Sequence, residues 1–170
     1  MSSPSKFKRI IFIFSIIRSL ACIVFIFSNS LKNGEKSNVQ SSYVYNLVNA
    51  AADKIGIKSE IPHALIRNLA HLVEFAMLGA FTAIIAIYVF NVTRSSSKVE
   101  IAKKLFSSAI FCTVVAILDE LIQFGSEGRA PQISDALLDV AGALLGIFAV
   151  WLTVIVIICI KRRKDLTKNS

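Results

Sequence analysis

Apolar residues in this chain are gathered into four long blocks that are separated by shorter polar segments. The blocks cover about residues 10–27, 64–90, 104–124 and 133–160. A helix needs about 20 mostly apolar residues to cross the hydrocarbon core of a bilayer. Because each block is long enough, the pattern predicts an all-α integral membrane protein that is built as a four-helix transmembrane bundle.

The distribution of Lys and Arg predicts how this bundle is oriented. Of the 19 Lys and Arg residues, 12 lie in the two tails and around the loop between the second and third blocks, and five lie on the other side. Cytoplasmic loops of membrane proteins are enriched in Lys and Arg. We therefore expect both termini to be cytoplasmic, with residues 1–9 and 161–170 as tails of a four-span domain that covers 10–160.

The outer segment between the first two blocks is long enough to hold structure of its own. Val39, Tyr43, Leu47 and Ala51 recur there at helical spacing, and Ser, Asn and Lys occupy most other positions. The pattern is typical of a short amphipathic helix on the outer membrane surface. A polar loop without regular structure is an equally good interpretation.

Composition supports the membrane interpretation. Hydrophobic residues make up 55% of the 170 residues and the mean hydropathy is +0.66, whereas soluble domains are about 45–50% apolar. A net charge of +8 would suggest nucleic acid as the partner of a soluble protein, but here basic residues flank the apolar blocks and no nucleic-acid-binding motif is present. Cys22, Cys112 and Cys159 lie inside the blocks without metal-ligand spacing, so we expect no disulfide.

Polar residues within the blocks converge on the ends that we expect to lie at the outer surface. A charged side chain at the bilayer centre costs about 2.5–3.5 kcal/mol on insertion scales, so such residues pair or serve a function. The predicted site consists of such residues and of Arg129 in the short loop between the third and fourth blocks: Arg67, His71, Glu74, Asp119, Glu120, Gln123, Arg129, Asp135 and Asp139. Their common depth predicts a ligand-binding site, and an ion-pair network that only locks the helices together is the alternative.

Spacing places several of these residues on shared helix faces. Arg67, His71 and Glu74 recur every three or four residues and form one stripe along the second span. The corresponding stripe of the fourth span consists of Asp135, Asp139, Gly142 and Gly146. Two glycines four residues apart would let another helix approach closely.

Acidic groups outnumber basic ones in this set. With Arg18, which lies within the first block, Arg67 and Arg129 supply three positive charges, whereas the five carboxylates of the set supply up to five negative ones. An excess of two negative charges is unfavourable at low dielectric, and a proton on a carboxylate, a proton on His71 or a bound cation would offset it. A divalent cation such as Mg²⁺ or Ca²⁺ would take oxygen ligands, for which the candidates are Asp119, Glu120, Asp135 and Asp139.

These motifs resemble those of the VanZ-like membrane proteins. The stretch from Arg67 to Phe75 is similar to the R-x-x-A-H-x-x-E-[YF] signature of that family, and residues 119–124 resemble its D-E-x-x-Q-x-F segment, although Phe here follows Gln directly. The element G-R-x-x-x-x-x-D is matched by Gly128-Arg129 and Asp135. The resemblance covers about residues 10–150, and Ile122 departs from it because many members have His there.

Two further motifs extend the resemblance. Asp139, Gly142 and Gly146 match the family's D-x-x-G-x-x-x-G, and Ser28-Asn29-Ser30 is similar to its F-S-S-Q motif after the first span. The resemblance implies a role in the bacterial cell envelope, in the plasma membrane, because the founding member is associated with low-level resistance to the glycopeptide teicoplanin. It implies no particular reaction.

The site and the resemblance together favour a protein that binds or modifies an outer-leaflet envelope molecule. Polyprenyl-linked wall precursors and lipoglycopeptides meet the membrane at this level, and Arg67 and Arg129 would hold their phosphate or carboxylate groups. We expect membrane lipids, and not nucleic acid, as the other partners.

Two other functions fit the same residues. An intramembrane metal-assisted hydrolase or transferase would use His71, Glu74, Asp119 and Glu120 as candidate catalytic groups, with His71 or Glu74 as the general base. A structural polar lock would need no ligand at all. A transporter is less favoured because the acidic residues stop short of the cytoplasmic half.

Overall fold

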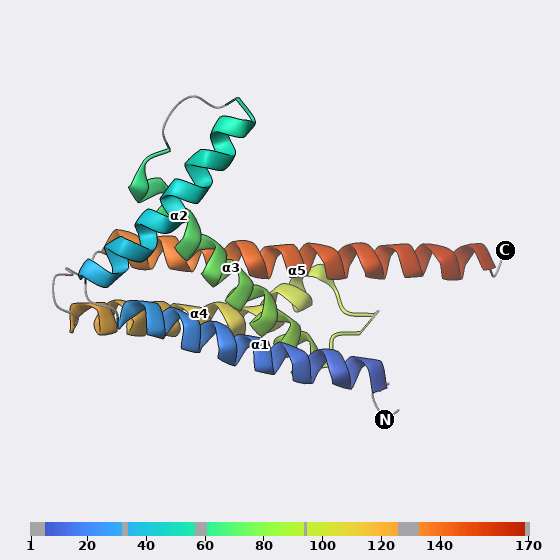
Figure 1. Cartoon of the computed structure of the whole chain (residues 1–170). Helices are drawn as coiled ribbons and strands as arrows, with labels where there is room; N and C mark the ends of the chain where they lie inside the picture. The colour runs from blue at the N-terminus through green and yellow to red at the C-terminus, as the bar shows by residue number, and fades with distance from the viewer. Residues whose placement is uncertain (1–5, 32–33, 57–60, 94, 126–132, 169–170) are drawn as a thin grey trace.

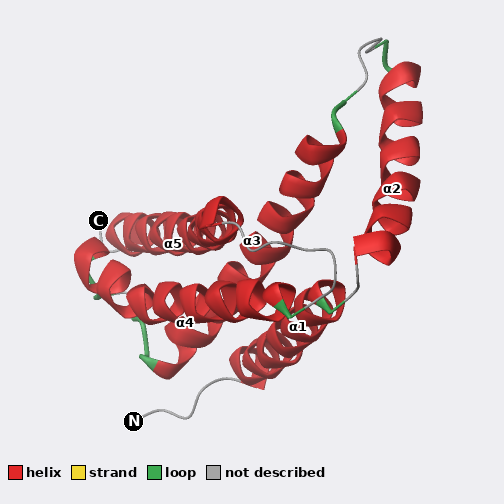
Figure 2. Ribbon diagram, turned by 90° about the vertical axis from the view of Figure 1, so that its left-hand side faces the viewer, coloured by secondary structure: helices red, strands yellow, loops and turns green. Residues whose placement is uncertain are grey.

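The computed structural model describes residues 6–31, 34–56, 61–93, 95–125 and 133–168 of the chain. The regular structure of these residues is entirely helical (Figure 2). The helices are α1 (Lys6–Ser30), α2 (Gly34–Lys54), α3 (His63–Val89), α4 (Lys98–Phe124) and α5 (Ile133–Lys168). Within the described ranges, α1, α3, α4 and α5 are long and apolar enough to cross a membrane. The predicted all-α fold with four spans is therefore confirmed.

Helices α1, α4 and α5 extend beyond the spans that hydropathy alone predicts. α4 begins at Lys98 because Ser97 caps it, with the Ser97 hydroxyl accepting a hydrogen bond from the Glu100 N–H at 3.1 Å. Such a cap satisfies one of the N–H groups that a helix start leaves without a partner. α5 continues through the basic segment to Lys168, where Lys and Arg favour a helix and interact well with its C-terminal dipole.

The four spanning helices alternate in direction, so that both chain termini lie on the same side of the bundle (Figure 1). α1 and α4 end, and α3 and α5 begin, at the opposite side. The polar residues of the predicted site that the structure describes all belong to the halves of α3, α4 and α5 nearer that second side. That this side faces outward stays a prediction from the Lys and Arg distribution.

α3 and α5 lie in close contact because small residues face a neighbouring backbone. A Cβ atom added to Gly142 would meet the backbone of Leu72, and one added to Gly146 would overlap the carbonyl oxygen of Ala76. The contacts advance in the same direction along both helices, which are therefore parallel. The prediction that the two glycines admit another helix is confirmed, and that helix is α3.

The bundle interior below the polar side is mainly apolar, with a few buried Ser and Thr side chains. One buried cluster joins all four spans and consists of Ile26, Phe75, Leu78, Cys112, Val115, Ala116 and Ala143. A second lies nearer the chain termini and consists of Ala83, Ala86, Ile101, Leu105 and Ile147. Many large apolar side chains point outward instead, as Phe106, Leu121 and Phe148 do. Such an exterior suits contact with lipid.

α2 shows that the segment after the first span is helical, as the amphipathic pattern predicted. The side-chain oxygen of Asn49 accepts a hydrogen bond from the N–H of Ile61 at 2.8 Å, and the Tyr45 ring stacks on His63. These contacts join α2 to the start of α3, and α2 extends away from the bundle (Figures 1 and 2). Leu47 in α2 and Ile55 just after it are exposed; the position of α2 at the outer membrane surface stays a prediction.

The α3–α5 contact predicts that Gly146→Ala destabilises the protein. The added methyl group would overlap the Ala76 carbonyl, and overpacking of a close-packed interior costs about 1–3 kcal/mol. We expect a lower thermal unfolding midpoint in detergent micelles. Gly125→Ala is the matched control, because a Cβ there meets the Ile122 carbonyl oxygen at an ordinary 3.5 Å. Equal midpoints for Gly146→Ala and wild type would contradict the close contact.

Candidate functional site

α3 and α5 place two pairs of polar side chains in successive turns. At the end of the bundle, Nη2 of Arg67 donates a hydrogen bond to Oδ2 of Asp135 at 2.7 Å. One turn deeper, Nδ1 of His71 lies 3.4 Å from Oδ1 of Asp139. In both pairs the α5 residue follows the α3 residue by 68 positions. The register of α5 against α3, which the contacts of Gly142 and Gly146 fix, therefore aligns both pairs.

Asp119 reaches the same region from the last turns of α4. Its side chain is fully buried. The Ser30 hydroxyl donates a hydrogen bond to Oδ1 of Asp119 at 2.5 Å, and Nε2 of Gln123 donates one to Oδ2 at 2.7 Å. The last residue of α1 and a neighbour one turn along α4 thus hold this carboxylate from both sides.

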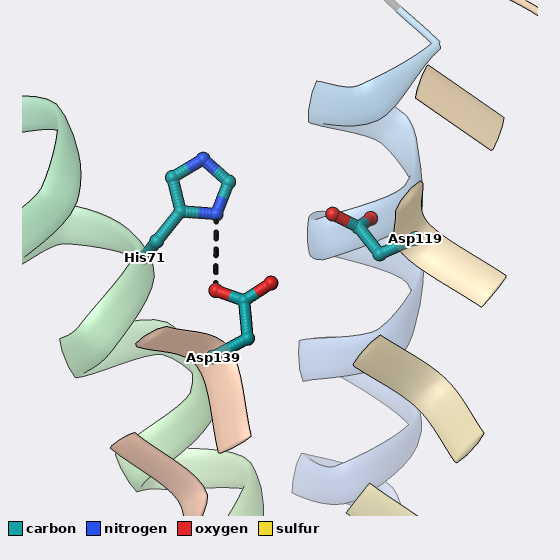
Figure 3. A group of neighbouring side chains, drawn as sticks. All are labelled: His71, Asp119 and Asp139. Atoms are coloured by element: carbon teal, nitrogen blue, oxygen red, sulfur yellow. Dashed lines mark ion pairs between the residues drawn. The ribbon is translucent and has the colours of Figure 1, made fainter. Parts of the chain in front are cut away.

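His71, Asp119 and Asp139 form one group that three helices contribute (Figure 3). One potential ligand atom from each residue lies within 4.8 Å of the other two. Asp139 is completely buried, and neither of its carboxylate oxygens has a hydrogen-bond partner among the described residues. Burial of a carboxylate without compensation is costly, so a proton on Asp139, a proton on His71 or a bound cation would stabilise this arrangement.

The remaining predicted site residues lie around this group. Glu74 is one turn further along α3 from His71, and Glu120 follows Asp119 in α4; both are partly buried and engaged in interactions of their own. Arg129 lies outside the described residues. Asp135 pairs with Arg67. The group of three combines a ring nitrogen with Asp119 and Asp139, two of the four carboxylates that the sequence suggested as metal ligands.

Ser30 is a site residue that the sequence analysis did not select. Its side chain is buried and contacts Asp119 across 89 positions of sequence. A serine at the end of a span carries no charge and does not stand out by periodicity. The signal that could have identified it is the similarity of Ser28-Asn29-Ser30 to the motif that follows the first span in VanZ-like proteins.

Fold and site together define a multi-pass membrane protein whose polar group is assembled from all of its spans. A family model described as VanZ/LLP1 matches residues 12–157, which include every residue of the candidate site. The chain therefore belongs to the VanZ family, as its motifs predicted, and is a VanZ-like envelope protein. Comparisons with curated proteins and with solved structures found no match.

The position of Ser30 predicts that Ser30→Ala destabilises the bundle. The change removes a buried hydrogen bond to the Asp119 carboxylate, and hydrogen bonds to charged groups contribute about 1.5–3 kcal/mol. We expect a lower thermal unfolding midpoint in micelles. Ser28→Ala is the matched control, because Ser28 is exposed in the same turn of α1. If both variants unfold at the same temperature, Ser30 does not hold Asp119.

Proposed function

We propose that this protein binds an anionic envelope molecule at the outer end of its bundle, in the plasma membrane of a bacterium. The observation that carries the proposal is the position of Arg67 at the end of α3, where its side chain is 44% exposed and is oriented by Asp135. A ligand in the outer leaflet would reach this guanidinium without entering the bundle.

The chemistry of Arg67 supports an oxyanion as the group that is bound. A guanidinium has five N–H donors in a planar fork, which matches phosphate and carboxylate oxygens. Asp135 takes one Nη2 hydrogen bond, so other donors remain for a ligand. Arg129, which lies outside the described residues and matches a family motif, would supply a second guanidinium. Polyprenyl-linked wall precursors and lipoglycopeptides both carry such oxyanions.

The gradient of burial supports a ligand that enters head first from the membrane surface. Exposure of the side chains falls along α3 from 44% at Arg67 to 21% at His71, and along α5 from 19% at Asp135 to 0% at Asp139. Polar groups therefore continue inward beneath the exposed guanidinium, while the outward faces of the helices are apolar. A molecule with a polar head and a lipid chain would match both surfaces. Such binding would also contribute to teicoplanin-type glycopeptide resistance.

An intramembrane metal-assisted hydrolase or transferase is the second candidate. It is favoured by the group of His71, Asp119 and Asp139, whose potential ligand atoms lie within 4.8 Å of one another. A metal there would polarise a bound oxygen or activate water. Recovery of the bound molecule in cleaved form, instead of intact, would distinguish this function from binding alone.

For the binding function, we expect Arg67→Ala and Arg129→Ala to abolish protection against teicoplanin in a susceptible bacterial host. Each change removes a guanidinium that would hold the oxyanion. Growth at increasing teicoplanin measures protection, and immunoblotting of membranes measures accumulation of the protein. Arg163→Ala is the control, because Arg163 is exposed at the other end of the bundle. Undiminished protection would contradict the proposal, and loss of the protein itself would favour the polar lock.

We also expect an anionic lipid to co-purify with the wild-type protein and to be depleted from Arg67→Ala. The charge of Arg67→Lys is unchanged but its planar fork is lost, so we expect an intermediate amount of lipid. Mass spectrometry of lipids extracted from equal amounts of purified protein makes the measurement. The same lipids in the same amounts from wild type and Arg67→Ala would rule out Arg67 as the binding residue.

A further inference from the structure

We propose that His71, Asp119 and Asp139 form a binding site for a divalent transition-metal ion such as Zn²⁺. The site lies one turn deeper than the Arg67–Asp135 pair and draws its ligands from α3, α4 and α5 (Figure 3). It does not depend on the envelope ligand proposed above.

The separation of His71 and Asp139 fits two ligands of one ion better than a direct hydrogen bond. Nδ1 and Oδ1 are 3.4 Å apart, whereas a charge-assisted N–H···O bond is about 2.7–2.9 Å long. Zinc takes nitrogen and oxygen ligands at about 2.0–2.2 Å, which puts neighbouring ligands of a tetrahedral site about 3.4 Å apart. One potential ligand atom of Asp119 lies within 4.8 Å of one from each of the other two residues, so a small side-chain rotation would complete the set.

Burial of Asp139 supplies the independent indication of a ligand. The side chain is 0% exposed, faces His71 and the Asp119 side, and has no hydrogen bond to either oxygen within the described part of the chain. Uncompensated carboxylate oxygens are costly in an apolar interior. Two carboxylates and a neutral imidazole carry two negative charges, which a divalent ion offsets, whereas a protonated His71 would offset only one.

Asp119 is already held in the manner of a metal ligand. Ser30 and Gln123 each donate a hydrogen bond to one of its oxygens, and each carboxylate oxygen has a second lone pair. Hydrogen bonds of this kind orient ligating carboxylates in metalloproteins, and their loss typically weakens metal binding by about 10–100-fold. The contribution of α1 to the site is therefore to fix this ligand.

The donor set indicates which ions would bind. An imidazole nitrogen suits Zn²⁺ and other transition metals, whereas Mg²⁺ and Ca²⁺ prefer oxygen ligands alone. Three protein ligands also leave a coordination position open for water or for an oxygen of a bound molecule, as in catalytic zinc sites. We therefore expect Zn²⁺ to bind more tightly than Mg²⁺ or Ca²⁺.

The test is a titration of the full-length protein in detergent micelles with Zn²⁺ alone, after the protein has been stripped of metal with a chelator. We expect one ion per chain, measured by elemental analysis and by competition with a chromophoric chelator. Binding to the folded state should raise the thermal unfolding midpoint. Absence of stoichiometric Zn²⁺ binding and of any shift in the midpoint would overturn the proposal.

The Zn²⁺ affinities of two Asp→Asn variants test where the ion binds. Asp139→Asn has the same size but lacks the charge, and we expect it to bind Zn²⁺ at least tenfold more weakly. Asp135→Asn is the matched control one turn above, and its affinity should equal that of wild type. Equal affinity in Asp139→Asn and wild type, or a loss confined to Asp135→Asn, would overturn the assignment.

Ser30→Ala provides a test that leaves all three ligands in place. We expect it to fold and to bind Zn²⁺ about tenfold more weakly, because Asp119 is less firmly oriented. Unchanged affinity would count against Asp119 as a ligand. If the wild-type protein binds Zn²⁺ but carries no envelope lipid, the metal site is supported and the proposed function is contradicted. If it carries the lipid but binds no Zn²⁺, the proposed function is supported and the metal site is contradicted.

Discussion

The close contact of α3 with α5 is the constraint on which the rest of the polar region depends. Gly142 and Gly146 remove the side chains that would hold the two backbones apart, so α5 can approach Leu72 and Ala76. In a membrane, where lipid is as apolar as the helix surfaces, such packing replaces the hydrophobic effect as the force between helices. The contact also fixes one register between two parallel helices. Both the Arg67 pair and the His71 pair follow from that register.

The polar group draws on every spanning helix. α1 contributes Ser30, α3 contributes His71, α4 contributes Asp119 and α5 contributes Asp139. No two of these helices alone would bring the same groups together. Charged groups within a membrane are costly unless they are paired or bound, so the positions of the four helices and the chemistry of the site depend on each other.

Much of the architecture followed from the sequence because span length and helical periodicity are local properties. Apolar length located the four spans, and the spacing of Arg67, His71 and Glu74 placed them on one face. Periodicity does not determine how one helix is rotated or shifted against another. It therefore could not predict that Asp135 pairs with Arg67 or that Asp139 pairs with His71. Ser30 was missed because a neutral residue at the end of a span acquires its role only from Asp119, 89 positions later.

The separation of 68 positions between partners has a consequence for biosynthesis. A ribosome adds about 5–20 residues per second, so roughly 3–14 s pass between synthesis of Arg67 and His71 and that of their acidic partners. During this interval α3 leaves the ribosome with a guanidinium and an imidazole whose acidic partners in α5 are not yet made. Near the end of its helix, Arg67 can keep its charge at the membrane–water interface. The pairing of these two side chains within the bundle therefore waits for the synthesis of α5.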